Sequence, residues 1–432
     1  MLSEYQQKPF RIAIIGFGTV GEGVYRTISD QGDKIKGLLG RPIAVTMIVV
    51  NQEKNREIGP DVKVTTDFND LIEEKHLDVV IEATPDAQTA YDYVKRLLEK
   101  GTSIVTANKE LIAKHGPELH QVAERNHCHL LFEAAVAGGI PLLNTIRHTL
   151  KTNNIERIEG ILNGTSNFIL TKMREGGTSF TEALYEAQEK GYAEVVPDKD
   201  INGWDALYKT EILSQWVYGK SPIWTTSKPI GIGSITRETI KLASALKGRM
   251  RHIASLSDTG KGIEASVQPY LVCEDHLLYG VDGVNNGIQI QGSIVGSIML
   301  QGPGAGKFPT ASAVIEDVIN LLTNCHEQRK VTDLVEVEQE VRNNKSAEET
   351  NIQWYYFIVS PNVEVKNGDG VTVLEDTSVE DKTYGAIVFS SIPLTDLEKQ
   401  YEGANIYPVL SKKLLENSSS LQEKHGKSIK VI

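Results

Sequence analysis

Short apolar runs and longer amphipathic segments alternate along the first third of the chain. The apolar runs have the length of buried strands and lie at residues 9–15, 43–50, 62–65, 77–83, 103–106 and 128–132. Between most of them, apolar positions recur with the period of a helix, most clearly over 89–100 and 110–126. Strands that alternate with helices are typical of α/β folds. The pattern therefore predicts a doubly wound parallel sheet at the N-terminus.

The pattern changes after about residue 141. A strand is predicted at 155–162, followed by a turn into a helix, and further helices are predicted at 181–190 and 204–217. Residues 263–300 alternate like antiparallel strands, with turns predicted at 282–283 and 285–287. Helices and antiparallel strands within one segment predict a mixed α+β domain.

The rest of the chain divides into three parts. The glycine cluster 302–306 precedes a predicted helix at 311–322, residues 326–350 are charged and polar enough to predict a linker, and a strand-rich unit follows. We therefore expect an N-terminal domain completed by a later helix, a middle domain, a linker and a small α+β C-terminal domain. Their boundaries are 1–140 with 303–325, 141–302, 326–350 and 351–432.

A glycine motif joins the first strand to the first helix. Gly16, Gly18 and Gly21 have the spacing of the dinucleotide-binding fingerprint. Gly16 would allow the tight turn, Gly18 would let the backbone approach a pyrophosphate, and Gly21 would let the helix pack closely. The helix N-terminus would hold the phosphate charge. We therefore expect a Rossmann domain that binds a nicotinamide dinucleotide, rather than a glycine-rich turn of structural use only.

The end of the second strand bears on the choice between NAD and NADP. An acidic residue there would bind a ribose 2′-hydroxyl. The strand instead ends at neutral Asn51, followed by Gln52, Lys54 and Arg56. A neutral side chain beside cations suits a 2′-phosphate. The sequence thus predicts a preference for NADP, with NAD as the alternative.

An acid and a base stand together on the predicted helix 204–217. With about 3.6 residues per turn, Asp205 and Lys209 fall in the middle of its apolar arc. The opposite side takes Thr210, Glu211, Ser214 and Gln215. A surface ion pair, worth about 0.3–0.5 kcal/mol, would be expected on that polar side. A partly buried charge pair is costly to keep, so we predict a site of chemistry at Asp205 and Lys209.

Two further charged residues follow predicted strands. Lys109 lies at the carboxyl end of a strand and the start of a helix, where such sheets bind ligands, although a solvated lysine is the alternative. Glu133 leads into a run of small residues at 134–141, whose bare carbonyls could seat a cation beside the carboxylate. A tight domain hinge is the other interpretation, and sequence logic alone favours it.

The glycine cluster near residue 304 resembles a P-loop but lacks its ends. Gln301 stands where the first glycine is required, and Phe308 where Ser or Thr is required. We therefore reject a nucleotide triphosphatase and expect a glycine-rich lip over the cofactor. The ten histidines show no metal-ligand spacing, and none is assigned a role.

Composition and charge exclude several classes of protein. Of 432 residues, 40% are hydrophobic and 24% charged, which is ordinary for a soluble globular protein. The formal net charge of -12 argues against nucleic acid. Cys128, Cys273 and Cys325 are too widely spaced for a disulfide framework or a CxxC metal pair. No signal peptide or membrane span is predicted, so we expect a cytoplasmic protein that binds small molecules.

Together these motifs resemble those of the homoserine dehydrogenases. The matching segments run in the family's order over residues 10–325. They are Gly-Phe-Gly-Thr-Val-Gly at 16–21, Thr-Ala-Asn-Lys at 106–109, the small-residue run 133–141, Asn-Gly-Thr-Ser-Asn-Phe-Ile-Leu at 163–170, Gly-Tyr-Ala-Glu through to Lys at 191–209, and Pro-Gly-Ala-Gly with Pro-Thr-Ala at 303–311. Several ordered motifs at matching spacings are a specific signal.

The resemblance implies a role for each candidate residue. It makes Lys209 the proton donor and acceptor, Asp205 its orienting carboxylate, and Lys109 a residue between substrate and cofactor. The implied substrate ligands are Glu194, Asp200, Gly164, Thr165 and Tyr192. The implied cofactor contacts are Gly16, Phe17, Gly18, Thr19, Val20, Gly21, Asn51, Thr84, Thr106, Lys109, Gly191 and Gly306. A monovalent cation, usually sodium in the family, would be held by Glu133 and the carbonyls of Val136, Gly138 and Ile140.

The reaction implied is the reversible reduction of aspartate 4-semialdehyde to homoserine by NAD(P)H. Lys209 would protonate the new alkoxide, while Glu194 and Asp200 would hold the substrate's ammonium group. The resemblance also implies a homodimer or tetramer, with dimerisation through the sheet of the middle domain. A dehydrogenase for another amino-acid aldehyde and a catalytically silent metabolite sensor are the alternatives.

The chain departs from the family pattern at identifiable places. Asn51 stands where many members carry Asp, and Ile81 to Pro85 differ from the usual Gly-Gly after that strand. In the tail, strands are predicted at 354–359, 371–375, 386–390 and 406–410, and a helix at 395–402. Because polar, glycine-rich 361–370 replaces an expected helix, the tail resembles a reduced ACT domain.

Overall fold

The computed structural model describes residues 8–324, except 53 and 55, and residues 354–414, except 362–363, 380–382 and 393. The predicted linker at 326–350 and Cys325 therefore lie outside the described residues. The chain divides into two compact units. Unit 1 comprises Met1–Thr152, Glu211–Ser221 and Gly302–Glu336, and unit 2 comprises Asn153–Thr210, Pro222–Gln301 and Val337–Ile432.

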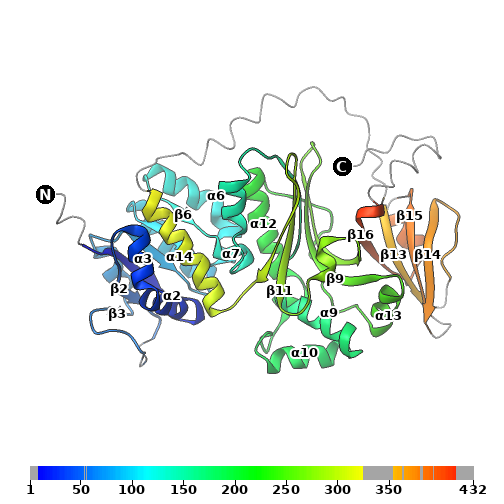
Figure 1. The fold of residues 1–432 in the computed structure, drawn as a ribbon, viewed down its shortest axis with the longest axis horizontal. Coiled ribbons are helices and arrows are strands. Elements are labelled where there is room, and N and C mark those ends of the chain that lie inside the picture. Colours follow the sequence, from blue (N-terminus) through cyan, green and yellow to red (C-terminus); the bar gives the residue numbers. More distant parts are fainter. Residues whose placement is uncertain are drawn as a thin grey trace. The chain divides into compact units, whose positions relative to one another are not determined.

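Unit 1 is built on a parallel sheet in the order β3-β2-β1-β4-β5-β6 (Figure 1). Its strands are β1 (Phe10–Ile15), β2 (Ile43–Val49), β3 (Lys63–Thr65), β4 (Val79–Glu82), β5 (Ser103–Thr106) and β6 (Leu130–Leu131). The strand order reverses its direction of growth between β1 and β4. The doubly wound sheet is thereby confirmed, and the reversal is the place where such sheets bind ligands.

Helices cover the sheet of unit 1, and α14 packs along α2. In Figure 1 the yellow α14 lies beside the blue α2 and α3. The core between them contains Ile14 of β1, Val24 of α2 and Val314 of α14. α14 begins at Lys307, before the predicted start at 311, because the turn of the glycine cluster already leads into it. The helices are α2 (Thr19–Asp30), α3 (Gly32–Leu39), α4 (Phe68–Glu73), α5 (Ala87–Glu99), α6 (Lys109–Arg125), α7 (Ala134–Ala137), α8 (Leu142–Asn144), the π-helical η1 (Thr145–Thr149) and α14 (Lys307–Asn324).

Unit 2 contains a mixed sheet in the order β12-β11-β7-β9-β10-β16-β13-β15-β14, with β8 pairing beside β10. Its strands are β7 (Ile155–Ile161), β8 (Ile223–Trp224), β9 (Gly248–Asp258), β10 (Ile263–Cys273), β11 (Asn285–Gly292), β12 (Gly296–Pro303), β13 (Trp354–Pro361), β14 (Val371–Val379), β15 (Thr383–Ser390) and β16 (Asn405–Leu410). Its helices are α9 (Gly164–Gly176), α10 (Phe180–Glu189), α11 (Asp198–Ile201), α12 (Trp204–Tyr218, shared with unit 1), α13 (Arg237–Ala245), the 3₁₀ turn η2 (Leu277–Gly280) and α15 (Leu394–Gln400). The predicted α+β domain is confirmed.

Two features of this sheet differ from the sequence prediction. β9, between β7 and β10, was not predicted because it buries the polar residues Arg251 and His252. The turn predicted at 285–287 is wrong, since these residues open β11 and Gly287 pairs with Ile161 of β7. Asn286 is fully buried and its amide is hydrogen-bonded within the unit, so a turn-like sequence is held in a strand.

α12 also differs from the predicted amphipathic helix. Asp205 and Lys209 are buried, as expected, but so are Thr210 and Ser214, which were predicted on a polar side. Both hydroxyls donate to backbone carbonyl oxygens, at 2.7 and 2.8 Å. Because most of the helix is enclosed, its polar groups must be satisfied within the protein. The predicted contrast of an apolar and a polar face is therefore wrong, although the charge pair is buried.

The described part of the tail adds strands β13 to β16 and helix α15, which confirms the predicted elements. β16 pairs in parallel with the end of β10, and the orange β13 and β15 extend the sheet beyond it (Figure 1). Residues 364–370 contain no helix. Phe357 and Ile387 share a buried core with Leu242 of α13. The tail is thus packed into unit 2 as a continuation of its sheet.

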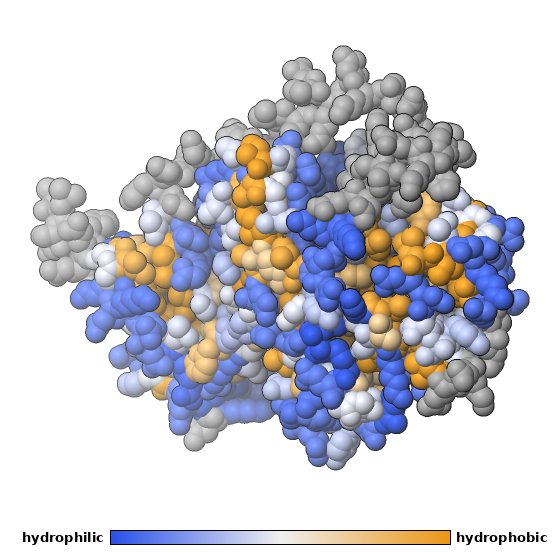
Figure 2. Space-filling view, turned by 45° about the vertical axis from the view of Figure 1, so that its right-hand side comes forward, coloured by the Kyte–Doolittle hydropathy of each residue, from blue (hydrophilic) through white to orange (hydrophobic). Residues whose placement is uncertain are grey.

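Among the residues that the structure describes, no helix is both long and apolar enough to cross a bilayer. On the face drawn in Figure 2, hydrophilic and hydrophobic residues are interspersed, as on most globular proteins.

Candidate functional site

The three glycines of the motif in unit 1 differ in what surrounds them. Gly16 has φ +89°, and a Cβ there would lie 2.6 Å from Ala83 O. A Cβ at Gly21 would lie 2.0 Å from Gly16 O, so only glycine lets α2 pack this closely. At Gly18, the N-cap of α2, a Cβ would meet no atom within 4 Å. The fold requires the first and third glycines, whereas Gly18 leaves space at a helix N-terminus, where phosphate binds.

The other predicted cofactor residues of unit 1 lie at or after the ends of strands at the same edge of the sheet, or precede α14. They are Phe17, Thr19, Val20, Asn51, Thr84, Thr106, Lys109 and Gly306. Because the carboxyl ends of parallel strands meet at one edge, the sheet brings most of them together. The Thr106 hydroxyl is buried and donates to the Glu82 carboxylate at 2.5 Å. Gly191, the remaining candidate, belongs to unit 2.

Lys209 is held between two oxygen atoms in unit 2. Its Nζ lies 2.9 Å from Asp205 Oδ2 and donates to the carbonyl oxygen of Leu162 at 2.6 Å. The side chains of Lys209 and Asp205 are only 9% and 7% exposed. In a buried pair the attraction only partly offsets the desolvation of two charges, so stability alone is a weak reason to keep one. The geometry excludes a solvated surface pair and supports a site of chemistry.

Asn163 connects the carboxylates of the predicted substrate site. Its Nδ2 donates to Asp200 Oδ1 at 2.8 Å and to Asp205 Oδ2 at 3.0 Å. Its Oδ1 accepts from Ser166 N at 2.8 Å and so caps α9. One amide therefore fixes two acidic side chains from different elements. The sequence analysis did not assign Asn163, although an Asn at a strand-to-helix turn is the usual sign of an N-cap.

The first turn of α9 also holds the loops that carry the other substrate candidates. Thr165 Oγ1 donates to Tyr192 O at 2.6 Å, and Ser166 Oγ donates to Asp200 O at 2.9 Å. Tyr192 and Glu194 are exposed on their loop. The fold thus gathers Thr165, Tyr192 and Asp200 at one helix end, while Glu194 projects toward solvent.

Asn286 shares the acceptor of Lys209. Its Nδ2 donates to Leu162 O at 3.0 Å, and the residue is fully buried. A Cβ at Gly164 would lie 2.6 Å from Val284 O, so the approach of this loop already requires glycine at 164. The sequence analysis missed Asn286 because Asn-Asn-Gly is a typical turn sequence.

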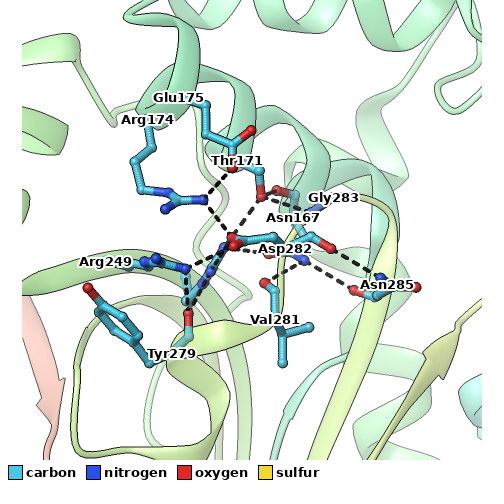
Figure 3. Close-up of polar contacts among 11 residues, drawn as sticks. Asn167, Thr171, Arg174, Glu175, Arg249, Tyr279, Val281, Asp282, Gly283 and Asn285 are labelled. Carbon is cyan, nitrogen blue, oxygen red and sulfur yellow. Dashed lines mark hydrogen bonds and ion pairs between the residues drawn. The ribbon is translucent and has the colours of Figure 1, made fainter.

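A buried guanidinium ties this loop to α9. Arg251 is 1% exposed and donates to Asn167 Oδ1 at 3.0 Å and to Asp282 Oδ1 at 2.6 Å. Asn167 in turn donates to the carbonyl oxygens of Val281 and Asn285, each at 3.1 Å (Figure 3). Helix α9, which begins at the substrate candidates, therefore fixes the turn that leads to Asn286.

Asp282 anchors the same turn by facing several cations. Besides Arg251, it pairs with Arg174 at 2.7 Å and with Arg249 at 2.9 Å (Figure 3). Burial acts to raise the pKa of Asp282, but the three guanidinium groups outweigh it and lower that pKa below its ordinary value. A carboxylate held in this way stays charged and keeps the turn in place.

His252 lies near Asp205 as a neutral side chain. It is 2% exposed, its Nε2 lies 3.0 Å from Ile230 O, and a Cβ at Gly203 would lie 3.1 Å from its ring. Burial lowers the pKa of His252 to about 4, although the Ile230 carbonyl and the charge of Asp205 act in the other direction. Because His252 is neutral, it does not compete with Lys209 for the negative charge of Asp205.

We expect His252 to make the protein acid-sensitive between about pH 6.5 and 4. Its folded pKa of about 4 lies below the ordinary 6.5, so the unfolded chain binds the extra proton in this window. The contribution of His252 to the free energy of unfolding is fully present above pH 6.5 and falls by up to about 3 kcal/mol as the pH drops to 4. Urea unfolding of wild type and His252→Gln at a series of pH values measures it. Equal pH slopes in the two proteins would contradict the prediction.

Glu133, the predicted cation ligand, is buried in unit 1 and binds backbone N–H groups. Its two carboxylate oxygens accept from Leu143 N at 2.9 Å and Asn144 N at 2.6 Å. Burial raises the pKa of Glu133 to about 7. Gly138 has φ +60°, and a Cβ there would lie 2.3 Å from Gly304 O. Among the described residues no group of three or more His, Cys, Asp or Glu side chains is arranged to hold a metal.

A doubly wound sheet with a dinucleotide-type glycine loop, together with the family matches that follow, defines an NAD(P)-dependent oxidoreductase that acts on a CH–OH group. The family model for the NAD-binding domain of homoserine dehydrogenase matches residues 16–133, and the homoserine dehydrogenase model matches residues 141–319. The chain belongs to the homoserine dehydrogenase family. The resemblance drawn from its motifs is thereby confirmed.

Curated relatives and solved structures agree with this assignment. The chain is 41% identical to a homoserine dehydrogenase of Neisseria gonorrhoeae over 315 residues, which cover 73% of this chain and 72% of the relative. A Bacillus subtilis homoserine dehydrogenase is 39% identical over 319 residues, covering 73% and 74%. The homoserine dehydrogenase of Thiobacillus denitrificans aligns with a TM-score of 0.81 at 28% identity, covering 94% and 99%. A hyperthermophilic archaeal homoserine dehydrogenase in complex with NADPH aligns with a TM-score of 0.63 at 29% identity, covering 73% and 98%.

Proposed function

We propose that this chain interconverts L-aspartate 4-semialdehyde and L-homoserine, with Lys209 as the proton donor and acceptor. The observation that carries the proposal is the buried ammonium group of Lys209, held by Asp205 Oδ2 and Leu162 O beside the substrate candidates. When bound, the nicotinamide cofactor supplies or takes the hydride. The open space at Gly18 fits such a dinucleotide.

The chain's own groups then move one proton. In the reducing direction, Lys209 Nζ gives a proton to the aldehyde oxygen as the aldehyde carbon gains a hydride, so the product is a primary alcohol. In the oxidising direction Nζ takes the hydroxyl proton back. Asp205 and the carbonyl of Leu162 fix the direction of Nζ, and proton transfer from a positioned group typically contributes about 10²–10⁴-fold to the rate.

The substrate's ammonium group calls for carboxylates as its partners. Asp200 is fixed by the amide of Asn163, and Glu194 is exposed on the loop that Thr165 holds through Tyr192. We assign both carboxylates to the ammonium group and Lys109 to the region between substrate and cofactor. An amino-acid aldehyde of another length would leave one of these charges unpaired, which disfavours it.

The loop after β2 supports a preference for NADP. Arg56 is folded back by hydrogen bonds from its guanidinium to the carbonyl oxygens of Gln52 and Lys54, at 2.9 and 3.2 Å. This arrangement keeps a cation close to exposed, neutral Asn51, where a 2′-phosphate would bind and where an acidic residue would repel it.

The test is the absorbance of the reduced cofactor when the purified chain receives homoserine with NADP or NAD. We expect turnover with homoserine, and a higher kcat/KM for NADP than for NAD. A panel of amino-acid aldehydes with NADPH is the control for specificity. A higher kcat/KM for another aldehyde would replace the substrate, strong selectivity for NAD would overturn the cofactor preference, and inactivity with every pair would indicate a metabolite sensor.

Two further parts of the proposal concern a cation and assembly. We assign a monovalent cation, sodium, to Glu133 and the carbonyls of Val136, Gly138 and Ile140, supported by the buried carboxylate beside a turn of small residues. We also expect a homodimer formed through the sheet of unit 2. Sedimentation tests the assembly, and a monomer would contradict it. Thermal unfolding in sodium and in choline salts tests the cation site, and the same unfolding midpoint in both salts would contradict it.

A further inference from the structure

Glu82 is a fully buried carboxylate that the proposed reaction does not use. It is the last residue of β4 and has no exposed surface. Its Oε1 accepts from Thr84 N at 2.6 Å and Thr84 Oγ1 at 2.5 Å, and its Oε2 accepts from Thr106 Oγ1 at 2.5 Å. Burial raises the pKa of Glu82, although the hydrogen bonds from Thr106 and Thr84 act in the opposite direction. A carboxyl group in the centre of a sheet is expensive, so its contacts indicate why it is there.

The contacts of Glu82 form part of a closed network between two loops. Thr106 Oγ1, which donates to Glu82, accepts from Asn108 N at 2.9 Å. Asn108 Nδ2 donates to Thr84 O at 3.0 Å, which returns the network to the loop after β4. Asn108 Oδ1 also caps α6 by accepting from Leu111 N at 3.0 Å. One carboxylate therefore fixes the loop after β4, the loop after β5 and the start of α6.

This network stands at the switch point of the sheet. β1 and β4 are neighbours, with Ile15 opposite Glu82, and the strand order reverses between them. Ala83 N donates to Ile15 O at 2.8 Å, and Ala83 O is the atom that a Cβ at Gly16 would meet at 2.6 Å. Open α/β sheets bind their ligands outside the strand ends at this point. The loops that Glu82 fixes therefore border the space in which the dinucleotide is bound.

We propose that Glu82 is a positioning residue of the cofactor site, which holds the Thr84 and Thr106 loops in the arrangement that receives the nicotinamide nucleotide. It does not touch the reacting atoms. Its two acceptor oxygens select one arrangement of both loops, and that arrangement also sets the first residue of α6, Lys109. The proposal rests on the cofactor that the family binds and is independent of Lys209 as the proton donor.

Glu82→Gln tests the proposal with little change in shape. The amide keeps one acceptor oxygen for Thr84 but presents N–H groups where Thr106 Oγ1 donates. We expect the Kd of the full-length chain for NADPH, measured by fluorescence titration, to rise about tenfold, as for the loss of a hydrogen bond to a charged group. The KM for homoserine should change less than twofold. Thermal unfolding without cofactor should be little affected, because a buried charge is removed together with the bond.

Matched variants separate positioning from general stability. Glu159→Gln alters another buried carboxylate, which lies 3.1 Å from His276 Nε2 in unit 2, and should leave the Kd for NADPH unchanged. Asn108→Asp keeps the acceptor oxygen that caps α6 but removes the N–H group that donates to Thr84 O, so it should weaken NADPH binding as Glu82→Gln does. If Glu82→Gln does not fold, Asn108→Asp carries the test. Unchanged NADPH affinity in Glu82→Gln or Asn108→Asp, with only a lower unfolding midpoint, would overturn the proposal.

Discussion

Lys209→Ala should lower kcat by about 10²–10⁴-fold, while the Kd for NADPH stays unchanged. Lys209 belongs to unit 2 and is buried against Asp205 and Leu162 O, whereas the dinucleotide loop belongs to unit 1. Loss of its ammonium group therefore removes the proposed proton donor without altering the glycine turn. Steady-state assays with homoserine and fluorescence titration with NADPH measure the two effects.

The same change leaves Asp205 as a buried charge without Lys209, which typically costs about 3–5 kcal/mol of stability. The double variant Lys209→Met with Asp205→Asn removes both charges, so it should recover stability but not activity. Lys228→Ala, at an exposed lysine of the same unit, is the control and should retain wild-type kcat. Appreciable turnover by folded Lys209→Ala would refute the assignment of the proton donor.

Gly21→Ala and Gly18→Ala should have opposite consequences although the motif contains both glycines. A Cβ at Gly21 would lie 2.0 Å from Gly16 O, a backbone atom that cannot move aside, so unit 1 should lose its folded structure. A Cβ at Gly18 meets nothing within 4 Å, so the fold should be retained. It would fill the space left for the pyrophosphate, and the Kd for NADPH should rise at least about tenfold, equal to about 1.4 kcal/mol.

Circular dichroism, thermal unfolding and NADPH titration distinguish these outcomes. Gly37→Ala is the matched control, since Gly37 lies in α3 of the same unit and is exposed, with nothing within 4 Å of its Cβ position. It should leave NADPH affinity unchanged and stabilise the helix by about 0.4–1 kcal/mol. A folded Gly21→Ala protein, or a Gly18→Ala protein with unchanged NADPH affinity, would contradict the roles assigned to the two glycines.

The sheet of unit 1 could be predicted because its strands are continuous apolar runs separated by helical periods. β9 could not, because a strand that buries Arg251 and His252 has no such run, and these side chains are hydrogen-bonded to residues distant in sequence, such as Asn167 and Ile230. Asn286 shows the reverse error. Local turn propensity is overridden by the pairing of β11 with β7 and by the buried hydrogen bond from Asn286 to Leu162 O.

The candidate site was predictable where the chemistry is local. Asp205 and Lys209 are one helical turn apart, so their pairing follows from spacing, even though the polar face expected opposite them is buried. Besides their local contacts, Asn163 and Glu82 bind partners that the fold brings to them, namely Asp200 and Thr106, which lie 37 and 24 positions away. Such roles leave no periodic signal in a single sequence.

The parallel pairing of β16 with β10 has a consequence for shortened forms of the chain. β10 is flanked by β8 at Glu264–Ala265 and by β16 at Leu271–Val272, so its outer side is covered near both ends. Removal of the tail would turn the end of β10 into an open edge, with unpaired N–H and C=O groups, and would uncover Leu242. An open edge of this kind is a template for strands of other molecules. The described part of the tail thus closes an edge of β10 that would otherwise be open to strands of other molecules.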